Sequence, residues 1–116
     1  MFRFEELEIW RLAVAYGREC YRLTDEFPKH EQYSLSDQLR RAGLSVSNNI
    51  TEGSIGSGKY FKKFINTAIA STLETVNIIN FAVEVGYLDE TKKKEMYEKA
   101  ETLIRKMRSF SKTLDD

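Results

Sequence analysis

The chain has 116 residues, enough for one domain, and its 41% hydrophobic and 31% charged residues are typical of a folded globular protein. The 18 Lys and Arg residues balance the 18 Asp and Glu residues, which excludes a uniformly basic nucleic-acid binder but not a local basic patch. A single cysteine, Cys20, excludes an intrachain disulfide, and a single histidine, His30, excludes the common His-based metal sites. We therefore expect no metal and no cofactor.

The sequence contains no targeting segment that we can identify. Residues 1–10 include three acidic side chains and no apolar core, unlike a signal peptide. The most apolar stretch, residues 64–85, is interrupted by Asn and Glu and does not resemble a transmembrane helix. We expect a cytoplasmic protein, and the single proline and six glycines favour a helical one.

The first half of the chain predicts two helices. The first spans about residues 4–26, where apolar residues recur at spacings of three and four, and Pro28 ends it. Its predicted inner line is Leu7, Trp10, Val14, Gly17 and Tyr21, with a flanking line of Ala13, Cys20 and Phe27. The second helix starts near Ser34 and carries an inner line that runs from Leu35 to Ile50, and Gly53 is its expected C-terminal cap.

The second half of the chain predicts two more helices. The third spans about residues 59–85 and stops at Gly86, and the fourth starts with Asp89 as its N-cap. The fourth helix has an unbroken inner line, which consists of Met96, Ala100, Leu103, Met107, Phe110 and Leu114. Because short connections make consecutive helices antiparallel neighbours, we predict an all-α, up-down-up-down four-helix bundle formed by residues 1–116 as a single domain.

Several residues of the middle helices are expected to be structural. Small side chains on the second and third helices predict that these two helices pack closely, or that this surface contacts another subunit. Asn49 lies on the inner line of the second helix, where a buried amide fixes register. Glu74 interrupts the apolar run of the third helix, and Arg41 on the antiparallel neighbour is its expected partner in a partly buried pair.

Positive charge is concentrated in residues 38–63, which carry a net charge of +4. Five basic side chains against Glu52 give this charge, and they are Arg40, Arg41, Lys59, Lys62 and Lys63. The residues from Gly53 to Lys59 match the start of a phosphate-binding P-loop, but Tyr60 replaces the Ser or Thr and no strand precedes the loop. Either this segment binds phosphate groups, or its lysines are simply solvated. A second basic run, at residues 105–112, suits the C-terminal end of a helix.

The same segment carries a family resemblance. Residues 38–42 (QLRRA) and 45–53 (SVSNNITEG) resemble the signature Q-x-R-R-A…S…N-I-A-E-G, which includes Glu52 and Gly53. Residues 26–35, 70–74 and 86–88 resemble its F-P-x-x-E-x-Y-x-L, G-S-x-x-E and G-Y-L stretches. The family comprises four-helix-bundle proteins encoded in intervening sequences of 23S ribosomal RNA, some of them called ribosomal proteins. The accessory variability proteins of diversity-generating retroelements look like relatives.

The resemblance implies a homopentameric ring, no catalysis and an association with nucleic acid. The sequence departs from the family pattern at Thr51 and Ala70. An arginine that is common in the family shortly after the E-G pair is also absent, and Lys59 is the basic residue nearest to its place. Oligomerisation is also expected because the aromatic residues cannot all face one bundle axis; these are Trp10, Tyr21, Phe61, Phe81 and Tyr97. We predict a non-enzymatic oligomer that contacts RNA or DNA through its basic hairpin, the alternative being a protein-binding adaptor without nucleic-acid contact.

Overall fold

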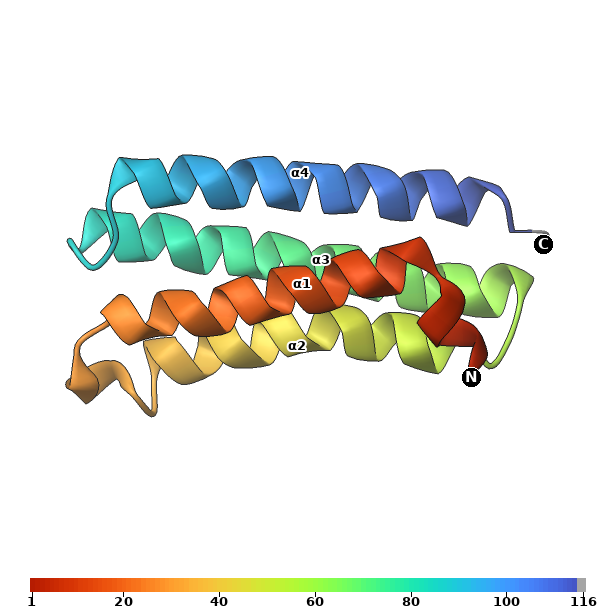
Figure 1. Cartoon of the computed structure of the whole chain (residues 1–116), viewed down its shortest axis with the longest axis horizontal. Helices are drawn as coiled ribbons and strands as arrows, with labels where there is room; N and C mark the ends of the chain where they lie inside the picture. The colour runs from red at the N-terminus through yellow and green to blue at the C-terminus, as the bar shows by residue number, and fades with distance from the viewer. Residues whose placement is uncertain (115–116) are drawn as a thin grey trace.

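The protein consists of four long helices in a computed structural model that describes residues 1–114. The helices are α1 (Glu8–Leu23), α2 (Leu35–Gly53), α3 (Gly58–Glu84) and α4 (Glu90–Lys112). Consecutive helices run antiparallel (Figure 1), and no strand occurs within residues 1–114. The predicted all-α, up-down-up-down four-helix bundle is confirmed, with its turns near Pro28, Gly56 and Gly86 as expected.

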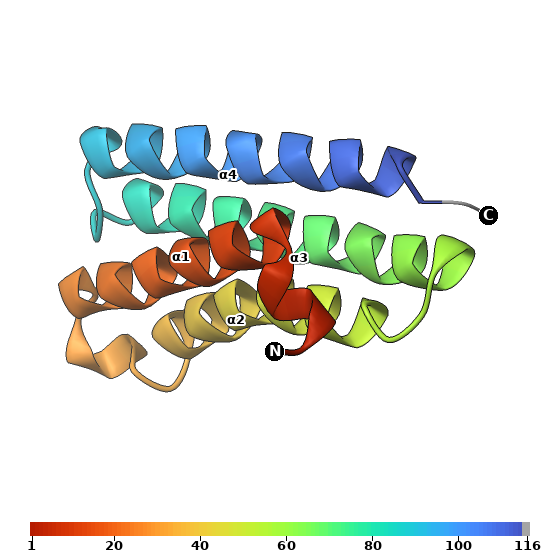
Figure 2. The same cartoon turned by 45° about the vertical axis from the view of Figure 1, so that its right-hand side comes forward.

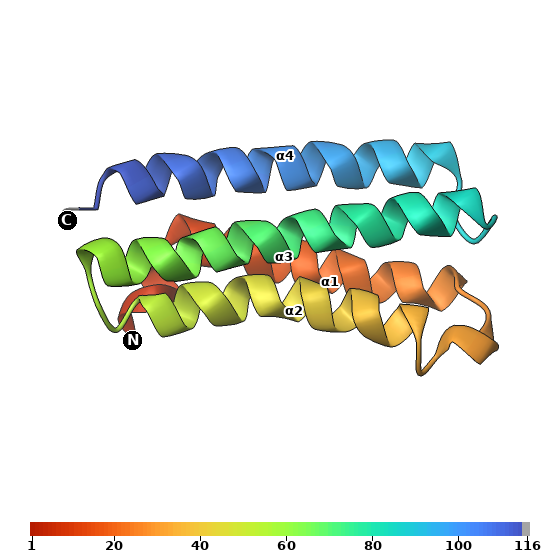
Figure 3. The same cartoon turned by 180° about the vertical axis from the view of Figure 1, so that it is seen from behind.

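The helices form an elongated bundle whose extents are 45 × 24 × 21 Å. Figures 1 and 2 show α4 beside α3, and the view from behind in Figure 3 shows α3 between α2 and α4, with α1 on the far side. Hence α1 and α3 occupy diagonal corners. The two helices meet through the core, where the Tyr16 hydroxyl lies 2.7 Å from the Thr75 hydroxyl.

Apolar side chains from all four helices form one buried core. The predicted inner lines of α2 and α4 are largely confirmed, and their fully buried members include Leu39, Val46, Ile50, Leu103 and Met107. From α3, Phe61, Ile65 and Ile79 are fully buried in the same core. The predicted inner line of α1 is partly wrong. Val14 and Tyr21 are 38% and 49% exposed, whereas Ile9, Tyr16 and Leu23 are buried. The helix is therefore rotated about its axis relative to the expectation.

A close approach between α1 and α2 explains this rotation. A Cβ atom built on Gly17 would lie 3.0 Å from the carbonyl oxygen of Gly43, and one built on Gly43 would lie 2.9 Å from Cβ of Cys20. The backbones can come this near only because both positions lack a side chain. Part of the small-residue surface of α2 thus faces α1, while Ser45 bonds to Ser71 of α3 at 2.9 Å as the predicted α2–α3 packing requires.

The first helix is shorter than predicted because each end continues as a 3₁₀ turn. The turn η1 (Arg3–Glu6) precedes α1 and is separated from it by Leu7, whose extended backbone interrupts the helix. At the other end, η2 (Thr24–Glu26) and η3 (Lys29–Glu31) flank Pro28. These short turns carry the chain around the end of the bundle and into α2.

The C-terminal end of α3 and the N-terminal end of α4 lie where the sequence predicts them. Gly86 has a φ of +87°, which favours glycine, and the Tyr87 amide donates to the Ala82 carbonyl at 2.8 Å, as in a Schellman motif. Asp89 caps α4 by accepting the Lys92 amide at 2.8 Å. Local sequence signals therefore predict where this turn lies.

Candidate nucleic-acid interface

Two basic runs that are far apart in the sequence meet at one end of the bundle. Lys59, Lys62 and Lys63 lie in the first turns of α3, beside the last turns of α4 (Figures 1 and 3). The rings of Phe61 and Phe110, 5.4 Å apart, join the two helices there. We call this region the basic end, and it consists of Lys59, Lys62, Lys63, Arg108 and Lys112. All of these are exposed except Lys62, which is half-buried.

The remaining basic residues of α4 at this end face acidic side chains. Lys106 pairs with Glu8 of α1 at 3.4 Å, and Arg105 lines the same shallow groove as Glu6. Arg105 and Lys106 therefore lie toward α1 and are not counted with the basic end. The sequence predicts the lysines of α3, but it assigns the α4 run only to the helix dipole.

Arg40 and Arg41 do not belong to this surface. They precede Gly53 by 13 and 12 residues on α2, which places them about 18 Å along the helix axis from its end. The Arg40 guanidinium donates to Oγ1 of Thr24 at 3.1 Å and to the carbonyl of Gln32 at 3.0 Å, so it holds the α1–α2 connection in place. The structure thus divides the five predicted binding residues into two groups.

The predicted partly buried pair of Arg41 and Glu74 is wrong. Glu74 is exposed, and Arg41 pairs instead with Asp37 one turn earlier on its own helix, at 2.8 Å. The expected register is close, because the Ser45–Ser71 contact places residue 41 opposite residue 75. Arg41 nevertheless bonds to Asp37 instead, and Glu74 is exposed to solvent, so this acid needs no buried partner.

The other residues predicted as structural have distinct environments. The half-buried Asn49 donates through Nδ2 to the Ser45 carbonyl at 2.8 Å, so its amide bonds within α2. Gly53 is the last residue of α2 rather than a left-handed cap, and a Cβ atom there would lie 2.8 Å from atoms of Phe61 and Phe64. Its role is therefore to let α3 approach. Glu52 is exposed and belongs to the surface.

Arg3 is an anchoring residue that the sequence did not reveal. Its guanidinium donates to the carbonyls of Ser54 and Gly56 at 2.9 and 3.0 Å and lies 5.2 Å from the centre of the Phe61 ring. These bonds satisfy carbonyl groups where α2 ends, which otherwise lack partners. The N-terminal segment is thereby held against the α2–α3 turn.

The opposite end of the bundle is held by Glu31. Its carboxylate accepts the Ser34 hydroxyl at 2.6 Å, the Tyr87 hydroxyl at 2.7 Å and the Leu35 amide at 3.3 Å. Hydrogen bonds from Ser34 and Tyr87 hold the pKa of Glu31 below its usual value, and the bond to Glu31 raises the pKa of Tyr87. This carboxylate, rather than the Ser34 side chain, caps α2 and ties it to the α3–α4 turn.

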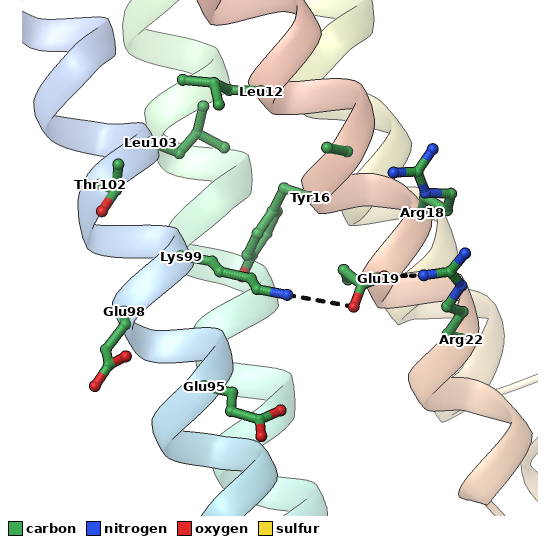
Figure 4. A pocket seen from close by; sticks show the side chains of 11 residues that line it. Leu12, Tyr16, Arg18, Glu19, Arg22, Glu95, Glu98, Lys99, Thr102 and Leu103 are labelled. Atoms are coloured by element: carbon green, nitrogen blue, oxygen red, sulfur yellow. Dashed lines mark hydrogen bonds and ion pairs between the residues drawn. The ribbon is translucent and has the colours of Figure 1, made fainter.

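A groove of about 620 Å³ separates α1 from α4 (Figure 4). Leu12, Tyr16 and Leu103 contribute apolar surface to it. Across its rim, Glu19 accepts Lys99 at 3.3 Å and Arg22 at 2.6 Å. Partial desolvation raises the pKa of Glu19, but the bonds and charges of Lys99 and Arg22 outweigh it and lower the pKa overall. With charges of both signs on its rim, this groove is a poor phosphate site.

The single cysteine lies in the core. Cys20 is fully buried, and burial raises the pKa of its thiol to about 12, as expected for an inert packing residue. Burial also raises the pKa of Tyr16. Within residues 1–114, no three His, Cys, Asp or Glu side chains are grouped to hold a metal ion. No helix of this region is long and apolar enough to cross a membrane.

Comparisons with known proteins agree with the fold and with the resemblance. Among solved structures, a protein of unknown function from the S23 ribosomal protein family of Bacteroides thetaiotaomicron is similar, with a TM-score of 0.80 and 16% identity over 90% of this chain and 95% of that chain. At this identity, the likeness shows the fold alone. No curated protein matches the chain. A family model described as 23S rRNA-intervening sequence protein matches residues 5–109. The chain therefore belongs to the 23S rRNA-intervening sequence protein family.

Proposed function

We propose that this protein is a non-enzymatic, oligomeric helical bundle that associates with RNA through its basic end. The observation that carries the proposal is the convergence of lysines from the start of α3 with Arg108 and Lys112 from the end of α4. Exposed cations grouped on one surface attract phosphates, whereas the same number of cations spread over a neutral protein produces little field. Arg40 is not part of this site, because it lies several helical turns away on α2, where it bonds to Thr24 and Gln32.

The proposal is tested by titrating a labelled RNA with the protein at several salt concentrations. The double variant Lys59→Glu/Lys63→Glu is expected to lose binding and to flatten the salt dependence, since each phosphate contact contributes about one unit to the slope. Its matched control is Lys29→Glu/Lys94→Glu, which changes the net charge equally at exposed positions of the opposite end. Equal binding by both double variants would remove the basic end as the RNA site.

Glutamates at positions 59 and 63 are not expected to harm folding. Position 59 lies in the first turn of α3, where an acidic side chain interacts favourably with the helix dipole and the native chain has none. Position 63 lies in the second turn and is exposed, so a glutamate there fills no buried space. A loss of RNA binding in this variant is therefore attributable to charge. A circular dichroism melt that matches the native protein confirms this point.

Homo-oligomerisation is supported by apolar side chains on two sides of the bundle. Val14 and Tyr21 are exposed on α1, while Leu73 and Phe81 are 52% and 53% exposed on α3, at the diagonal corner. Two different patches suit the head-to-tail contact of a closed ring, whereas a two-fold dimer uses one patch twice. Of the other predicted interface aromatics, Phe61 is fully buried and Trp10 and Tyr97 are half-buried.

Light scattering measures the assembly directly. The resemblance to the family predicts five copies, and thus a mass five times the 13.5 kDa of one chain. Phe81→Glu is expected to dissociate the assembly, because a charge in an apolar contact is costly. Tyr33→Glu is the control, since Tyr33 is 88% exposed in the connection before α2. A native protein that is monomeric at micromolar concentration contradicts this part of the proposal.

The same apolar side chains support the alternative, an adaptor that binds a partner protein without touching nucleic acid. The two functions differ in which substitution abolishes them. An adaptor loses its partner when Leu73 or Phe81 is changed and is indifferent to Lys59→Glu/Lys63→Glu. The RNA-binding function has the opposite dependence on the lysines.

A further inference from the structure

Three exposed apolar side chains lie together beside the basic end. Phe2 is 71% exposed, Ile55 is 82% exposed and Tyr60 is 44% exposed. We call the surface formed by the rings of Phe2 and Tyr60, with Ile55 between them in the sequence, the aromatic tip. Figures 1 and 3 both show the N-terminus beside the turn between α2 and α3, which contains Ile55 and leads to Tyr60. Solvent-exposed apolar groups clustered in this way are typical of a contact surface.

The rings of the aromatic tip are held in position by the fold. The two hydrogen bonds from Arg3 to Ser54 and Gly56 fix the N-terminal segment on the turn, and Phe2 precedes Arg3 directly. The Phe2 ring stacks on Phe4 with centroids 6.0 Å apart and planes 8° apart. Because one ring face is covered and most of the side chain is exposed, Phe2 presents a ready surface for another flat ring.

Tyr60 is held in a similar way. Its ring lies 5.1 Å from that of Phe64 and packs so closely on Gly56 that a Cβ atom at position 56 would collide with it. A ring that is already ordered loses little conformational entropy when a ligand stacks on it. Both aromatic side chains are therefore preorganised for stacking in the unbound protein.

The two nearest exposed lysines flank Tyr60 on the same helix. At 3.6 residues per turn, positions 59, 60 and 63 fall within an arc of about 100°. The outer surface of this turn thus combines a half-exposed phenol ring with the ammonium groups of Lys59 and Lys63. Unpaired nucleotides have both features that fit this surface, an open base face and a negatively charged backbone.

We infer that the basic end binds single-stranded rather than duplex RNA, with an unpaired base stacked on Tyr60 or Phe2 and the adjoining phosphates held by Lys59 and Lys63. In a duplex the bases are stacked on one another and offer no face to a protein ring. Duplex RNA can therefore use only the lysines and leaves the aromatic tip without a partner. This inference rests on the proposed RNA association and specifies the class of RNA.

Fluorescence anisotropy tests the inference with two probes, a labelled uridine-rich strand of about 12 nucleotides and a duplex with the same number of phosphates. The native protein is expected to bind the single strand at least tenfold more tightly. Tyr60→Leu is expected to weaken single-strand binding roughly 5- to 150-fold, the range for loss of one stacked base, and to leave duplex binding unchanged. Tyr33→Leu, at the other end of the bundle, is the control and should have no effect.

Phe2→Leu provides a second variant in case Tyr60→Leu disturbs the turn, and circular dichroism checks the folding of both. Equal affinity for the two probes, or unchanged single-strand binding in both leucine variants, overturns the inference. If Lys59→Glu/Lys63→Glu still lowers binding in that case, the proposed RNA association stands without it. If neither probe binds the native protein, the RNA association itself fails.

A lipid surface is the competing explanation for apolar side chains beside lysines. Sedimentation with phosphatidylserine vesicles separates the two cases. RNA binding that depends on Tyr60, together with no retention on vesicles, supports the inference. Retention that depends on Tyr60 and Phe2, in a protein that does not bind the single strand, overturns it.

Discussion

Replacing Gly43 by alanine tests the close contact between α1 and α2. The new Cβ atom would lie 2.9 Å from Cβ and 3.2 Å from Sγ of Cys20, where carbon atoms in contact prefer about 3.5–4.0 Å. The Cys20 Cβ is attached directly to the backbone and cannot rotate away, so the helices must move apart. Such overpacking costs about 1–3 kcal/mol, while the better helix propensity of alanine returns about 1 kcal/mol. We expect a net destabilisation of up to about 2 kcal/mol.

Urea unfolding followed by circular dichroism measures this difference, at one protein concentration because assembly also contributes to stability. The pair Asn48→Ala and Asn48→Gly gives the propensity difference at an exposed position of the same helix. There, alanine is expected to be the more stable by about 1 kcal/mol. If Gly43→Ala stabilises the protein by a similar amount, the backbones do not need a glycine at this crossing and the reasoning is refuted.

Three further predictions concern single side chains. Cys20 should resist thiol reagents in the native protein, since it is fully buried with a pKa near 12, and rapid native labelling would contradict this. Arg40→Ala should lower stability by about 1 kcal/mol through loss of its bond to Thr24, while RNA binding stays unchanged. Tyr87→Phe should lower Tm at pH 7. The folded-state pKa of Glu31 is depressed, so its stabilising effect is lost as the pH falls below about 4.3, the pKa of a glutamate in the unfolded chain. The Tm difference between the native protein and Tyr87→Phe should therefore be smaller at pH 3 than at pH 7. A difference that does not change with pH would exclude Glu31 as its cause.

The existence of four helices could be predicted, but the orientation of α1 about its axis could not. Apolar residues occupy two adjacent lines on this helix, and spacing alone does not say which line is inside. Val14 and Tyr21 are larger than Ala13 and Cys20 on the flanking line, which suggests that the line of Val14 and Tyr21 faces the core. The structure instead buries Tyr16 and exposes Tyr21. The orientation of α1 depends on the close contact between Gly17 and Gly43. This contact involves two helices, so the pattern of apolar residues in one helix does not reveal it.

The basic surface illustrates a similar limit. A count of charges along the sequence places Arg41 and Lys59 in one basic segment, although the length of α2 separates the two residues in the bundle. The same count separates Lys59 from Arg108, which the antiparallel α3–α4 pair brings to one end. Residues in one helix are separated by about 1.5 Å along its axis for each residue between them. A turn reverses the direction of the chain, so it can bring residues that are distant in the sequence to the same end of the bundle. Charge clusters therefore become predictable only after the helix lengths and turns are known.

The residues that carry the family resemblance have mainly structural contacts. Phe27 packs on Tyr87 with ring centroids 5.6 Å apart, and Glu31 bonds to the same tyrosine. Arg40 ties the connection between α1 and α2 to α2. These contacts lie at or toward the end of the bundle opposite Lys59, whereas Gly53, the last residue of the signature, packs against Phe61 and Phe64 at the basic end. A sequence signature with this distribution reports how the helices are joined, so it identifies the fold well and says little about what the protein binds. Binding is better sought at the basic end, where the lysines are exposed and the fold holds Phe2 and Tyr60 with much of their surface open to solvent.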